Sequence, residues 1–189
     1  MNTQAPSSAT LGADIRALRK ARGLTLVEIA ARLDRSVGWF SQVERDMSDP
    51  SISDLRLIAE CLGVPMSMLF AHSAAPADEL GYVVRAGARR PMGSDREGLI
   101  EELLSPDLTD DFEMVHSTFE PCSRMQTPAD RPTQEVGYIV SGQLDLTIGS
   151  RHFTVGEGDS FRIKNEPYQW ANPYDEPAVA VWVIAPPVY

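Results

Sequence analysis

Charged and aromatic side chains that could hold a small molecule recur in the second half of the chain, between residues 124 and 170. A carboxylate beside aromatic rings suits a cationic ligand such as an amine. An arginine instead suits a ligand that carries a carboxylate, because its guanidinium pairs with both oxygens. The sequence leaves both ligand classes open. The residues that could supply these groups are Arg124, Glu135, Tyr138, Arg162, Tyr168 and Trp170.

A second set of side chains, between residues 25 and 45, suits contact with nucleic acid. On a helix that begins near Ser36, the outward residues would include Val37, Gly38 and Gln42. Valine can contact a thymine methyl group and glutamine can pair with adenine, while glycine lets the backbone approach DNA closely. Ser36 and the helix N-terminus suit a phosphate, and Trp39 would pack on the sugar-phosphate or on a neighbouring helix. The other members of this set are Thr25, Arg35, Ser41 and Arg45.

Two short helices, 25–33 and 36–45, must position this second set, and about two residues separate them. This spacing predicts a helix-turn-helix unit. In such a unit the second helix enters the major groove with its N-terminal end. Asp34 occupies the turn, where aspartate tolerates the left-handed conformation. The alternative is an ordinary pair of helices whose apolar patch binds a second copy.

Helical periodicity extends to about residue 70 and predicts five short helices. Thr25 with Glu28, and Ser51 with Asp54, are capping pairs at two helix starts. Gly63 suits a helix C-cap. The apolar stripes contain Leu11, Ile15 and Leu18, then Phe40 and Val43, then Ile52, Leu55, Ile58, Ala59 and Leu62, and finally Met68, Leu69 and Phe70.

Beyond a linker predicted over residues 72–81, short segments rich in Val, Ile, Phe, Tyr and Thr are broken by Gly and Pro. The segment "LDLTIG" alternates strictly, so Leu144, Leu146 and Ile148 are expected on one face. Repeated strands with frequent turns predict an all-β sandwich or barrel. The segment "EGLIEELLS", residues 97–105, fits either a short helix or an edge strand.

The net charge of −10 lies entirely in the second half of the chain. Residues 1–72 hold 8 basic and 8 acidic side chains, whereas residues 73–189 hold 9 and 19. An acidic protein is a poor partner for DNA, yet residues 11–35 carry six basic side chains against three acidic ones. No stretch approaches the roughly 18 apolar residues of a membrane span, and residues 1–10 lack the apolar run of a secretory signal. We therefore expect a disordered tail and a cytoplasmic protein without membrane contact.

Residues 11–71 resemble the XRE, or Cro/phage-repressor-like, helix-turn-helix domain. The chain departs from that family at Leu26, where a phosphate-contacting Gln is common, and at Asp34 and Asp46, where Gly is usual. The resemblance implies an all-α five-helix repressor-like domain that binds double-stranded DNA. The matching residues are Leu24–Thr25, Ala30, Ser36, Ser41, Val43 to Arg45, Pro50-Ser51, Ile58-Ala59 and Leu62.

Residues 82–189 resemble a cupin, an all-β double-stranded β-helix or jelly-roll barrel. "EVGYIVSG" and "GEGDSFRIKNEPYQWAN" are similar to the two cupin motifs, and "VWVIAPP" to the closing strand of regulators that join an XRE domain to a cupin. The resemblance places three metal-binding histidines near Pro128 and Asp130 and at Tyr168, with the glutamate at Glu135. Only Glu135 is retained, and Asp130 adds one carboxylate to the candidate effector site. Since metal sites need several converging ligands, we expect no metal and no cofactor.

The three histidines do not replace the lost ligands. His72 lies at the linker and His152 follows a turn, so His152 is expected at the surface. His116 lies on a predicted strand, where it would be a hydrogen-bonded core residue or face the barrel interior. GxSxG motifs, phosphate-binding glycine loops and CxxC pairs are absent from the sequence. We therefore expect no enzymatic activity.

Together these features predict a sequence-specific DNA-binding transcriptional regulator. Its cupin domain would dimerise and sense a small-molecule effector, and the homodimer would bind a palindromic operator. Two alternatives stay open, a regulator whose cupin only dimerises and a cupin enzyme with a helical appendage. A bound metal would favour the enzyme, and a small molecule that co-purifies would favour the sensor.

Overall fold

The computed structural model describes residues 10–70, 78–79, 81–93 and 96–188. Most of the expected N-terminal tail and of the expected linker, His72 included, lies outside these residues. The chain divides into two compact units. One unit holds the helices together with the residues up to 93 and residues 105–110, and the other holds residues 96–104 and 111–188.

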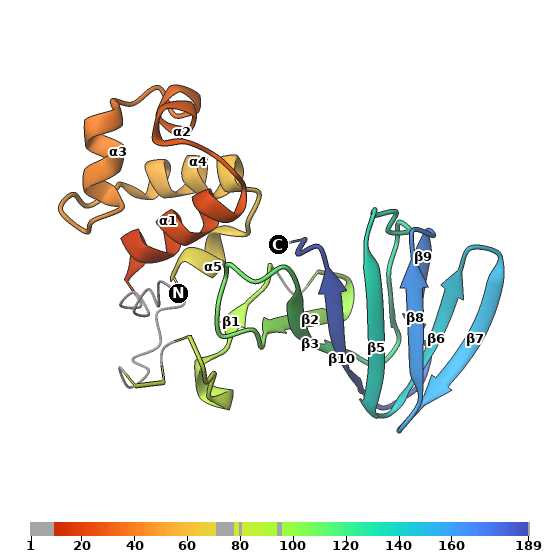
Figure 1. The fold of residues 1–189 in the computed structure, drawn as a ribbon. Helices are drawn as coiled ribbons and strands as arrows, with labels where there is room; N and C mark the ends of the chain where they lie inside the picture. The colour runs from red at the N-terminus through yellow and green to blue at the C-terminus, as the bar shows by residue number, and fades with distance from the viewer. Residues whose placement is uncertain (1–9, 71–77, 80, 94–95, 189) are drawn as a thin grey trace, which may run out of the picture. The chain divides into compact units, whose positions relative to one another are not determined.

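Five helices form the first unit, as the periodicity predicts (Figure 1). Isolated helices of this length are marginal in water, so the burial of their apolar stripes in a common core holds them in place. The helices are α1 (Leu11–Ala21), α2 (Leu26–Arg32), α3 (Val37–Val43), α4 (Ile52–Leu62) and α5 (Met66–Phe70). The core residues are Ile15, Leu18, Ile29, Phe40, Val43, Ile58, Leu62 and Met68.

The predicted helix ends of this unit are confirmed. Thr25 caps α2 through a capping box with Glu28, and Ser51 caps α4 through a capping box with Asp54. Gly63 ends α4 in the left-handed conformation, at φ 67°. These local contacts satisfy backbone groups that the first and last turns of a helix leave unpaired.

Residues 81–93 pack within the helical unit, although the sequence places the start of the cupin at residue 82. This segment contains the short helix η1 (Ala86–Ala88) and the strand β1 (Arg90–Pro91). Arg90 pairs with Asp14 of α1 at 2.7 Å and donates to the Met68 carbonyl at 3.3 Å. Ser67 Oγ donates to the Pro91 carbonyl at 3.2 Å. These long-range contacts attach the segment to the helices.

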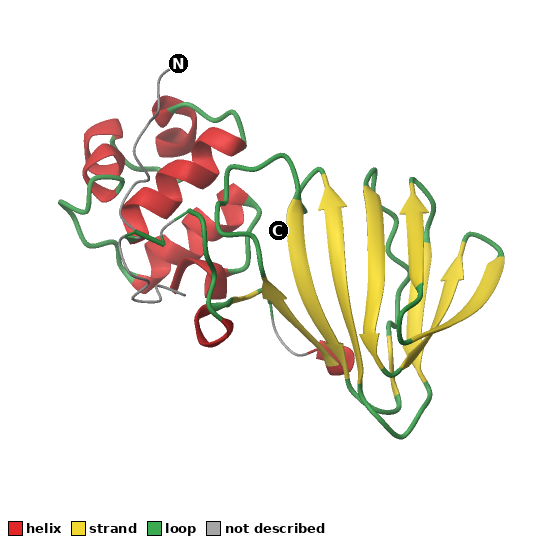
Figure 2. Ribbon diagram, turned by 60° about the horizontal axis from the view of Figure 1, so that its bottom comes forward, coloured by secondary structure: helices red, strands yellow, loops and turns green. Residues whose placement is uncertain are grey.

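The second unit consists of antiparallel strands in two sheets (Figure 2). Within this unit one sheet has the order β2-β3-β10-β5-β8 and the other β4-β9-β6-β7. The ambiguous segment 97–105 contains a strand, because Leu99–Leu103 pairs with the strand that ends at Phe119. The elements are η2 (Arg96–Gly98), β2 (Leu99–Leu103), β3 (Glu113–Phe119), β4 (Ser123–Arg124), β5 (Gln134–Ser141), β6 (Gln143–Ile148), β7 (Arg151–Gly156), β8 (Ser160–Lys164), β9 (Tyr168–Asn172) and β10 (Ala178–Ala185).

Burial alternates along most of these strands, β3, β5, β6, β9 and β10 above all, which defines an inner and an outer face for each sheet. Leu144, Leu146 and Ile148 are buried, as the strict alternation of β6 predicts. We call the space lined by the buried faces the barrel interior. Several aromatic rings face it, and Gly137 of β5 is required there because a Cβ would overlap the ring of Phe161.

Candidate DNA-binding surface and barrel interior

Helix α3 presents an open face opposite its buried one. Phe40 and Val43 are buried in the helical core, whereas Val37 is 41% exposed. A Cβ added at Gly38 would meet nothing within 4 Å, and Gln42 is exposed. The residues expected to face DNA bases therefore share one accessible surface.

The turn between α2 and α3 has the backbone that the sequence predicts. Asp34 adopts a positive φ of 51°, and Ser36 caps α3 by accepting the Trp39 amide at 3.1 Å. Arg35 donates to Asp54 at 2.7 Å, and its guanidinium carbon lies 5.1 Å from the centre of the Trp39 ring. Trp39 is half-buried beside this guanidinium, which leaves part of its ring available to a partner.

The C-terminal end of α3 is held against α1 by two polar contacts. Arg19 forms a bidentate salt bridge with Glu44, in which two guanidinium nitrogens donate to the two carboxylate oxygens at 2.5 and 3.0 Å. Both side chains are buried. Asp46, at a positive φ of 55°, accepts from the Gly12 amide at 2.9 Å and from Thr10 Oγ1 at 2.6 Å. Because both pairs bridge residues more than 20 positions apart, they orient α3 relative to α1.

The remaining residues of the predicted DNA-binding set also lie on the helical unit. The backbone amide of Thr25 donates to the Glu28 carboxylate and lowers the pKa of Glu28, and the Thr25 hydroxyl donates to the same carboxylate and lowers it further. Arg45 is exposed and donates to the Ser41 carbonyl at 3.0 Å. Ser41 itself is half-buried. The bases and phosphates that these residues contact stay predictions.

The structure separates the residues that the sequence groups as an effector site. Glu135, Tyr168 and Trp170 are buried on inner faces of the barrel. Tyr138, which is 50% exposed, and Arg162 point to the outer face, because each alternates with a buried neighbour. These two candidate effector residues therefore lie on the face opposite Glu135 and do not line the same space as Glu135.

The other residues predicted at the effector site, and the two histidines among the described residues, lie at the surface or on outer faces. Asp130 is exposed on the loop between β4 and β5, and Arg124 is exposed on β4. His116 is half-buried on the outer face of β3, 3.9 Å from Glu102, so it does not face the barrel interior. His152 is exposed, as the sequence predicts.

Glu101 is an interior carboxylate that the sequence pattern did not predict. Glu101 lies on the inward side of β2, where its carboxylate accepts a hydrogen bond from Ser117 Oγ at 3.2 Å. Thr133 Oγ1 donates to Glu135 Oε1 at 2.7 Å. Had residues 97–105 been assigned as a strand, alternation with Leu103 would have placed Glu101 on the buried face.

The interior groups influence one another electrostatically. Burial raises the pKa of Glu101, and the nearby Glu135 carboxylate raises it further. Burial also raises the pKa of Tyr168, again with a contribution from Glu135. The guanidinium of Arg131 opposes both shifts, although Arg131 itself is exposed on the loop. Two carboxylates, a phenol and a guanidinium thus lie within electrostatic range of one another.

Several buried polar atoms of the barrel have no hydrogen-bond partner among the described residues. They are Glu135 Oε2, Trp170 Nε1 and Trp182 Nε1. The Trp182 ring lies 6.2 Å from the Tyr168 ring, and the Trp170 ring packs edge-on against Phe119 at 4.8 Å. An unpaired buried polar group is costly, so these atoms are candidates for contacts with a bound molecule.

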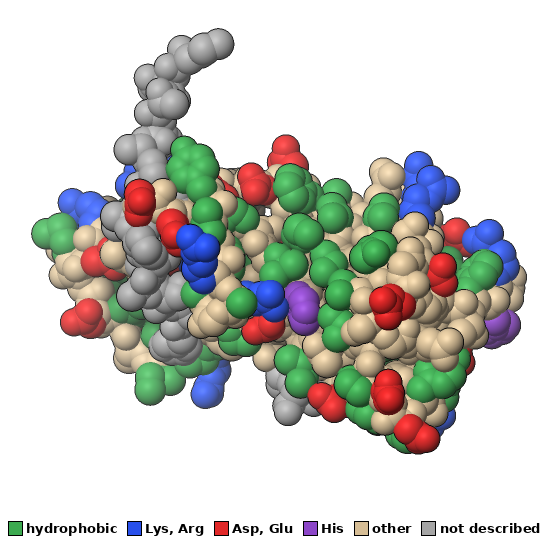
Figure 3. Space-filling view, turned by 90° about the horizontal axis from the view of Figure 1, so that it is seen from below, with side chains coloured by type: hydrophobic (Ala, Val, Ile, Leu, Met, Phe, Trp, Pro, Cys, Tyr) green, Lys and Arg blue, Asp and Glu red, His purple; other side chains and the backbone are tan. Residues whose placement is uncertain are grey.

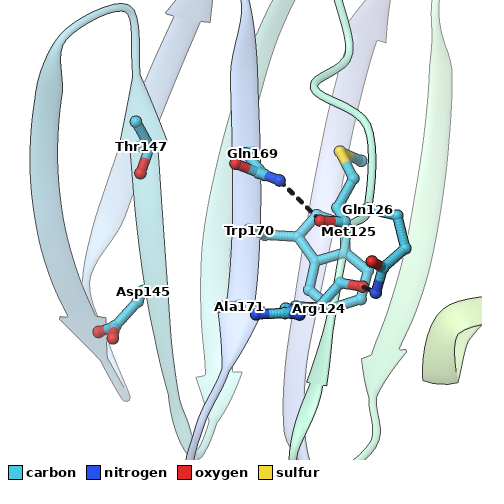
Figure 4. A pocket seen from close by; sticks show the side chains of 8 residues that line it. All are labelled: Arg124, Met125, Gln126, Asp145, Thr147, Gln169, Trp170 and Ala171. Carbon is cyan, nitrogen blue, oxygen red and sulfur yellow. Dashed lines mark hydrogen bonds between the residues drawn. The ribbon is translucent and has the colours of Figure 1, made fainter.

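A separate pocket lies on the outer face of the smaller sheet (Figure 4). Its volume is about 280 Å³, near the lower end for ligand pockets. Asp145 and Thr147 alternate with the buried residues of β6, so this pocket is not the barrel interior. Gln169 donates to the Met125 carbonyl across its wall at 2.7 Å. The lining residues are Arg124, Met125, Gln126, Asp145, Thr147, Gln169, Trp170 and Ala171.

Among the described residues, no three His, Cys, Asp or Glu side chains gather closely enough to hold a metal ion. Glu113, a further inner-face carboxylate, accepts from the Val188 amide at 3.1 Å.

None of the helices in the described part of the chain is long and apolar enough to cross a membrane.

Comparisons with known proteins match both units. The model of a helix-turn-helix domain matches residues 10–69, and that of a cupin domain matches residues 115–184. The HTH-type transcriptional regulator PuuR of Escherichia coli (strain K12) is 24% identical over 159 residues, which cover 82% of this chain and 83% of PuuR. The immunity repressor protein of Bacillus phage phi105 is 38% identical over 60 residues, 32% of this chain and 42% of the repressor.

Two solved structures with low sequence identity are also similar to parts or most of this chain. An HTH_3 family transcriptional regulator from Vibrio cholerae is 22% identical, covers 95% of this chain and 96% of its own, and has a TM-score of 0.46. The Cupin_2 domain of an XRE family transcriptional regulator from Enterobacter cloacae is 22% identical, covers 48% of this chain and 98% of its own, and has a TM-score of 0.43. This chain is therefore a DNA-binding transcriptional regulator in which an XRE-type helix-turn-helix domain is joined to a cupin domain.

Proposed function

We propose that this regulator recognises a specific palindromic operator as a homodimer and senses a small molecule through its cupin barrel. The observation that carries the DNA-reading part is the open face of α3. Val37, Gly38 and Gln42 are accessible while Phe40 and Val43 are buried. A helix whose solvent face lacks charged residues is expected when that face meets base edges.

One recognition helix reads only a few base pairs, so a second copy is required for a unique site. A two-fold dimer reads two inverted half-sites whose centres lie about one helical turn, roughly 34 Å, apart. Gln42 supplies base discrimination. Arg35 and Arg45, both exposed, supply affinity that depends on salt, because phosphate contacts release counterions.

The dimer contact is proposed on the outer face of the larger cupin sheet, which we call the apolar sheet face. Hydrophobic side chains gather on this side of the molecule (Figure 3), and an exposed apolar patch of this kind marks an interaction surface. The exposed residues of the face are Ile100, Met114, Val136, Tyr138, Val140 and Val183.

The charges beside the apolar sheet face favour a second copy of this chain as the partner. Glu102 lies on the outward side of β2, near one side of the sheet, whereas Arg162 and Lys164 lie outward on β8 at the other side. A two-fold axis through the middle strand β10 brings β2 of one copy over β8 of its partner. Opposite charges then meet at both ends of the apolar contact.

Effector sensing is proposed in the barrel interior because Glu135 is completely buried and one of its oxygens lacks a partner among the described residues. The outer pocket lined by Arg124 and Asp145 is a second candidate. If the cupin domain only dimerises, neither the barrel interior nor the outer pocket would bind an effector.

The experiment that tests the DNA-reading function is a binding titration against a selected palindrome and a scrambled duplex at two salt concentrations. Gln42→Ala should cost about 1–3 kcal/mol at one position of each half-site and relax selectivity there. Gly38→Glu should abolish specific binding, because its carboxylate would meet phosphates. If both variants bind the palindrome like the wild type, α3 is not the recognition helix and its open face binds a protein partner instead.

A further inference from the structure

The barrel interior has the chemistry of a site for a positively charged ligand. We propose that it binds a small organic cation, a compound with an ammonium group, between Glu135 of β5 and Glu101 of β2. This inference rests on the proposed effector-sensing function and specifies the class of effector. It also resolves the choice between amines and carboxylates that the sequence leaves open.

The first support is the unequal use of the two Glu135 oxygens. Oε1 accepts a hydrogen bond from Thr133 Oγ1 at 2.7 Å, whereas Oε2 has no partner within hydrogen-bond distance among the described residues. The Tyr168 hydroxyl is the neighbouring polar group, and its interaction with Glu135 contributes to the raised pKa of Tyr168. The Glu135 side chain is 0% exposed, so water does not reach this oxygen from the surface. A buried carboxylate oxygen without a donor is strongly disfavoured, and an ammonium group supplies the missing donor together with its countercharge.

The second support is that another carboxylate faces the same space. Glu101 points inward from β2 and accepts from Ser117 on the neighbouring strand. Ser117 of β3 pairs in register with Ala180 of β10. The inner wall beside Glu101 therefore carries small side chains. A carboxylate ligand would meet two negative groups here, whereas a cation would interact favourably with both.

Aromatic residues complete the site. Tyr168 and Trp182 are buried close to one another, with ring centres 6.2 Å apart. Trp182 of β10 lies directly across from Gly137 of β5. Gly137 is two residues after Glu135 on the same strand. Aromatic faces attract a desolvated cation. Trp182 Nε1 also lacks an acceptor among the described residues, so a ligand that carries a hydroxyl or carbonyl oxygen near its ammonium group would satisfy both atoms.

The pattern favours an organic cation over a metal ion. The described residues contain no group of three metal-binding side chains, and two carboxylates with aromatic neighbours offer too few ligands for a transition metal. An ammonium group needs only hydrogen-bond acceptors and tolerates apolar walls. The guanidinium of Arg131 lies within electrostatic range of Glu101 and Tyr168, and its side chain is exposed on the loop between β4 and β5.

The test uses the full-length protein and probes matched in shape. Butylamine and benzylamine are each compared with the alcohol and the carboxylate of the same carbon skeleton, by thermal shift and by isothermal titration. Both amines should raise the melting temperature further as their concentration increases, with the logarithmic dependence expected once the concentration exceeds the dissociation constant, and the alcohols and carboxylates should not. Amine shifts absent at every concentration, or equalled by the alcohols, would overturn the proposal, and shifts from the carboxylates would indicate an anion site instead.

Isosteric variants locate the effect. Glu135→Gln should weaken amine affinity roughly ten- to a hundredfold, as expected for loss of a charge-assisted hydrogen bond, and Glu101→Gln should weaken it in the same direction. Glu157→Gln removes a carboxylate from an exposed hairpin turn and should bind amines like the wild type. Loss of amine binding in Asp145→Asn, with Glu135→Gln unaffected, would move the site to the outer pocket and refute the interior one.

Operator binding by the same preparations keeps the two proposals separate. Glu157→Gln without ligand should bind the selected palindrome as the wild type does, because Glu157 belongs to neither proposed site. A protein that binds the palindrome but no amine refutes the cation inference and leaves the DNA-reading function intact. Amine binding without specific DNA binding refutes the DNA-reading function and leaves the ligand class intact.

Discussion

Gly12 is predicted to be indispensable for holding α3 in position. A Cβ at residue 12 would overlap the Val43 carbonyl oxygen, at the end of α3, and come within 2.9 Å of Asp46 Oδ1. Asp46 accepts the Gly12 amide and Thr10 Oγ1 in the same contact. Both clashing groups are held by the backbone or by these hydrogen bonds, so neither can move away freely.

The expected cost of Gly12→Ala follows from these contacts. Overpacking costs about 1–3 kcal/mol, and weakened hydrogen bonds to Asp46 cost about 1 kcal/mol more. Replacing Gly by Ala inside a helix gains about 0.5–1 kcal/mol, so the variant should lose roughly 1–3 kcal/mol. For a domain of this size, each kcal/mol lowers the melting temperature by about 4–8 °C.

The assay is thermal unfolding of the full chain, followed by the helical signal in far-ultraviolet circular dichroism. Gly38→Ala is the matched control, because a Cβ there meets nothing within 4 Å and the helix-propensity gain should raise the melting temperature slightly. The two substitutions should therefore change the melting temperature in opposite directions. If Gly12→Ala unfolds at or above the wild-type temperature, the contact between α1 and α3 is not close-packed and the reasoning fails.

Four further outcomes are expected. Glu44→Ala should lose about 3–5 kcal/mol in urea denaturation, because it leaves a buried arginine unpaired. The hydrogen bond from Ser51 lowers the pKa of Asp54 in the folded protein below 3.8, so its stabilising contribution is present above that value and is lost as the pH falls through the folded pKa. Asp54→Asn should accordingly flatten the acid limb of the melting-temperature profile. Burial raises the pKa of Glu101 above 4.5, so its ionised form opposes folding, and Glu101→Gln should melt higher than the wild type at neutral pH. Val136→Glu, on the apolar sheet face, should shift sedimentation velocity from dimer to monomer.

Each of these four has a result that would contradict it. Equal stability of Glu44→Ala and wild type would show that the buried pair contributes nothing net. If the acid limb of the melting-temperature profile is the same in Asp54→Asn as in the wild type, the Ser51–Asp54 capping box does not cause the loss of stability in acid. The melting-temperature gain of Glu101→Gln must shrink as the pH falls toward 4.5, and a constant gain would point to packing rather than charge. A Val136→Glu protein that still sediments as a dimer would exclude the apolar sheet face as the interface.

The sequence by itself determined the features that depend on residues close together in the chain. The capping pairs Thr25–Glu28 and Ser51–Asp54 join residues three apart, and both form. The left-handed turn at Asp34 and the alternation of "LDLTIG" were predicted for the same reason. A hydrogen bond within one helical turn or the two-residue period of a strand is a local property that the residue order specifies.

Only the tertiary structure decided which faces of the strands are inside. Tyr138 and Glu135 lie three residues apart on β5, so the strand period places them on opposite faces, but which of those faces is inside depends on how the sheets pack. Residues 97–105 fit a helix or a strand until pairing with β3 assigned them, and Glu101 joined the interior through that pairing. Such neighbours are distant in sequence, and a shift of one residue in register would reverse every side chain. The amphipathic pattern therefore predicted a barrel, and the pairing of its strands placed Glu101 inside it together with Glu135.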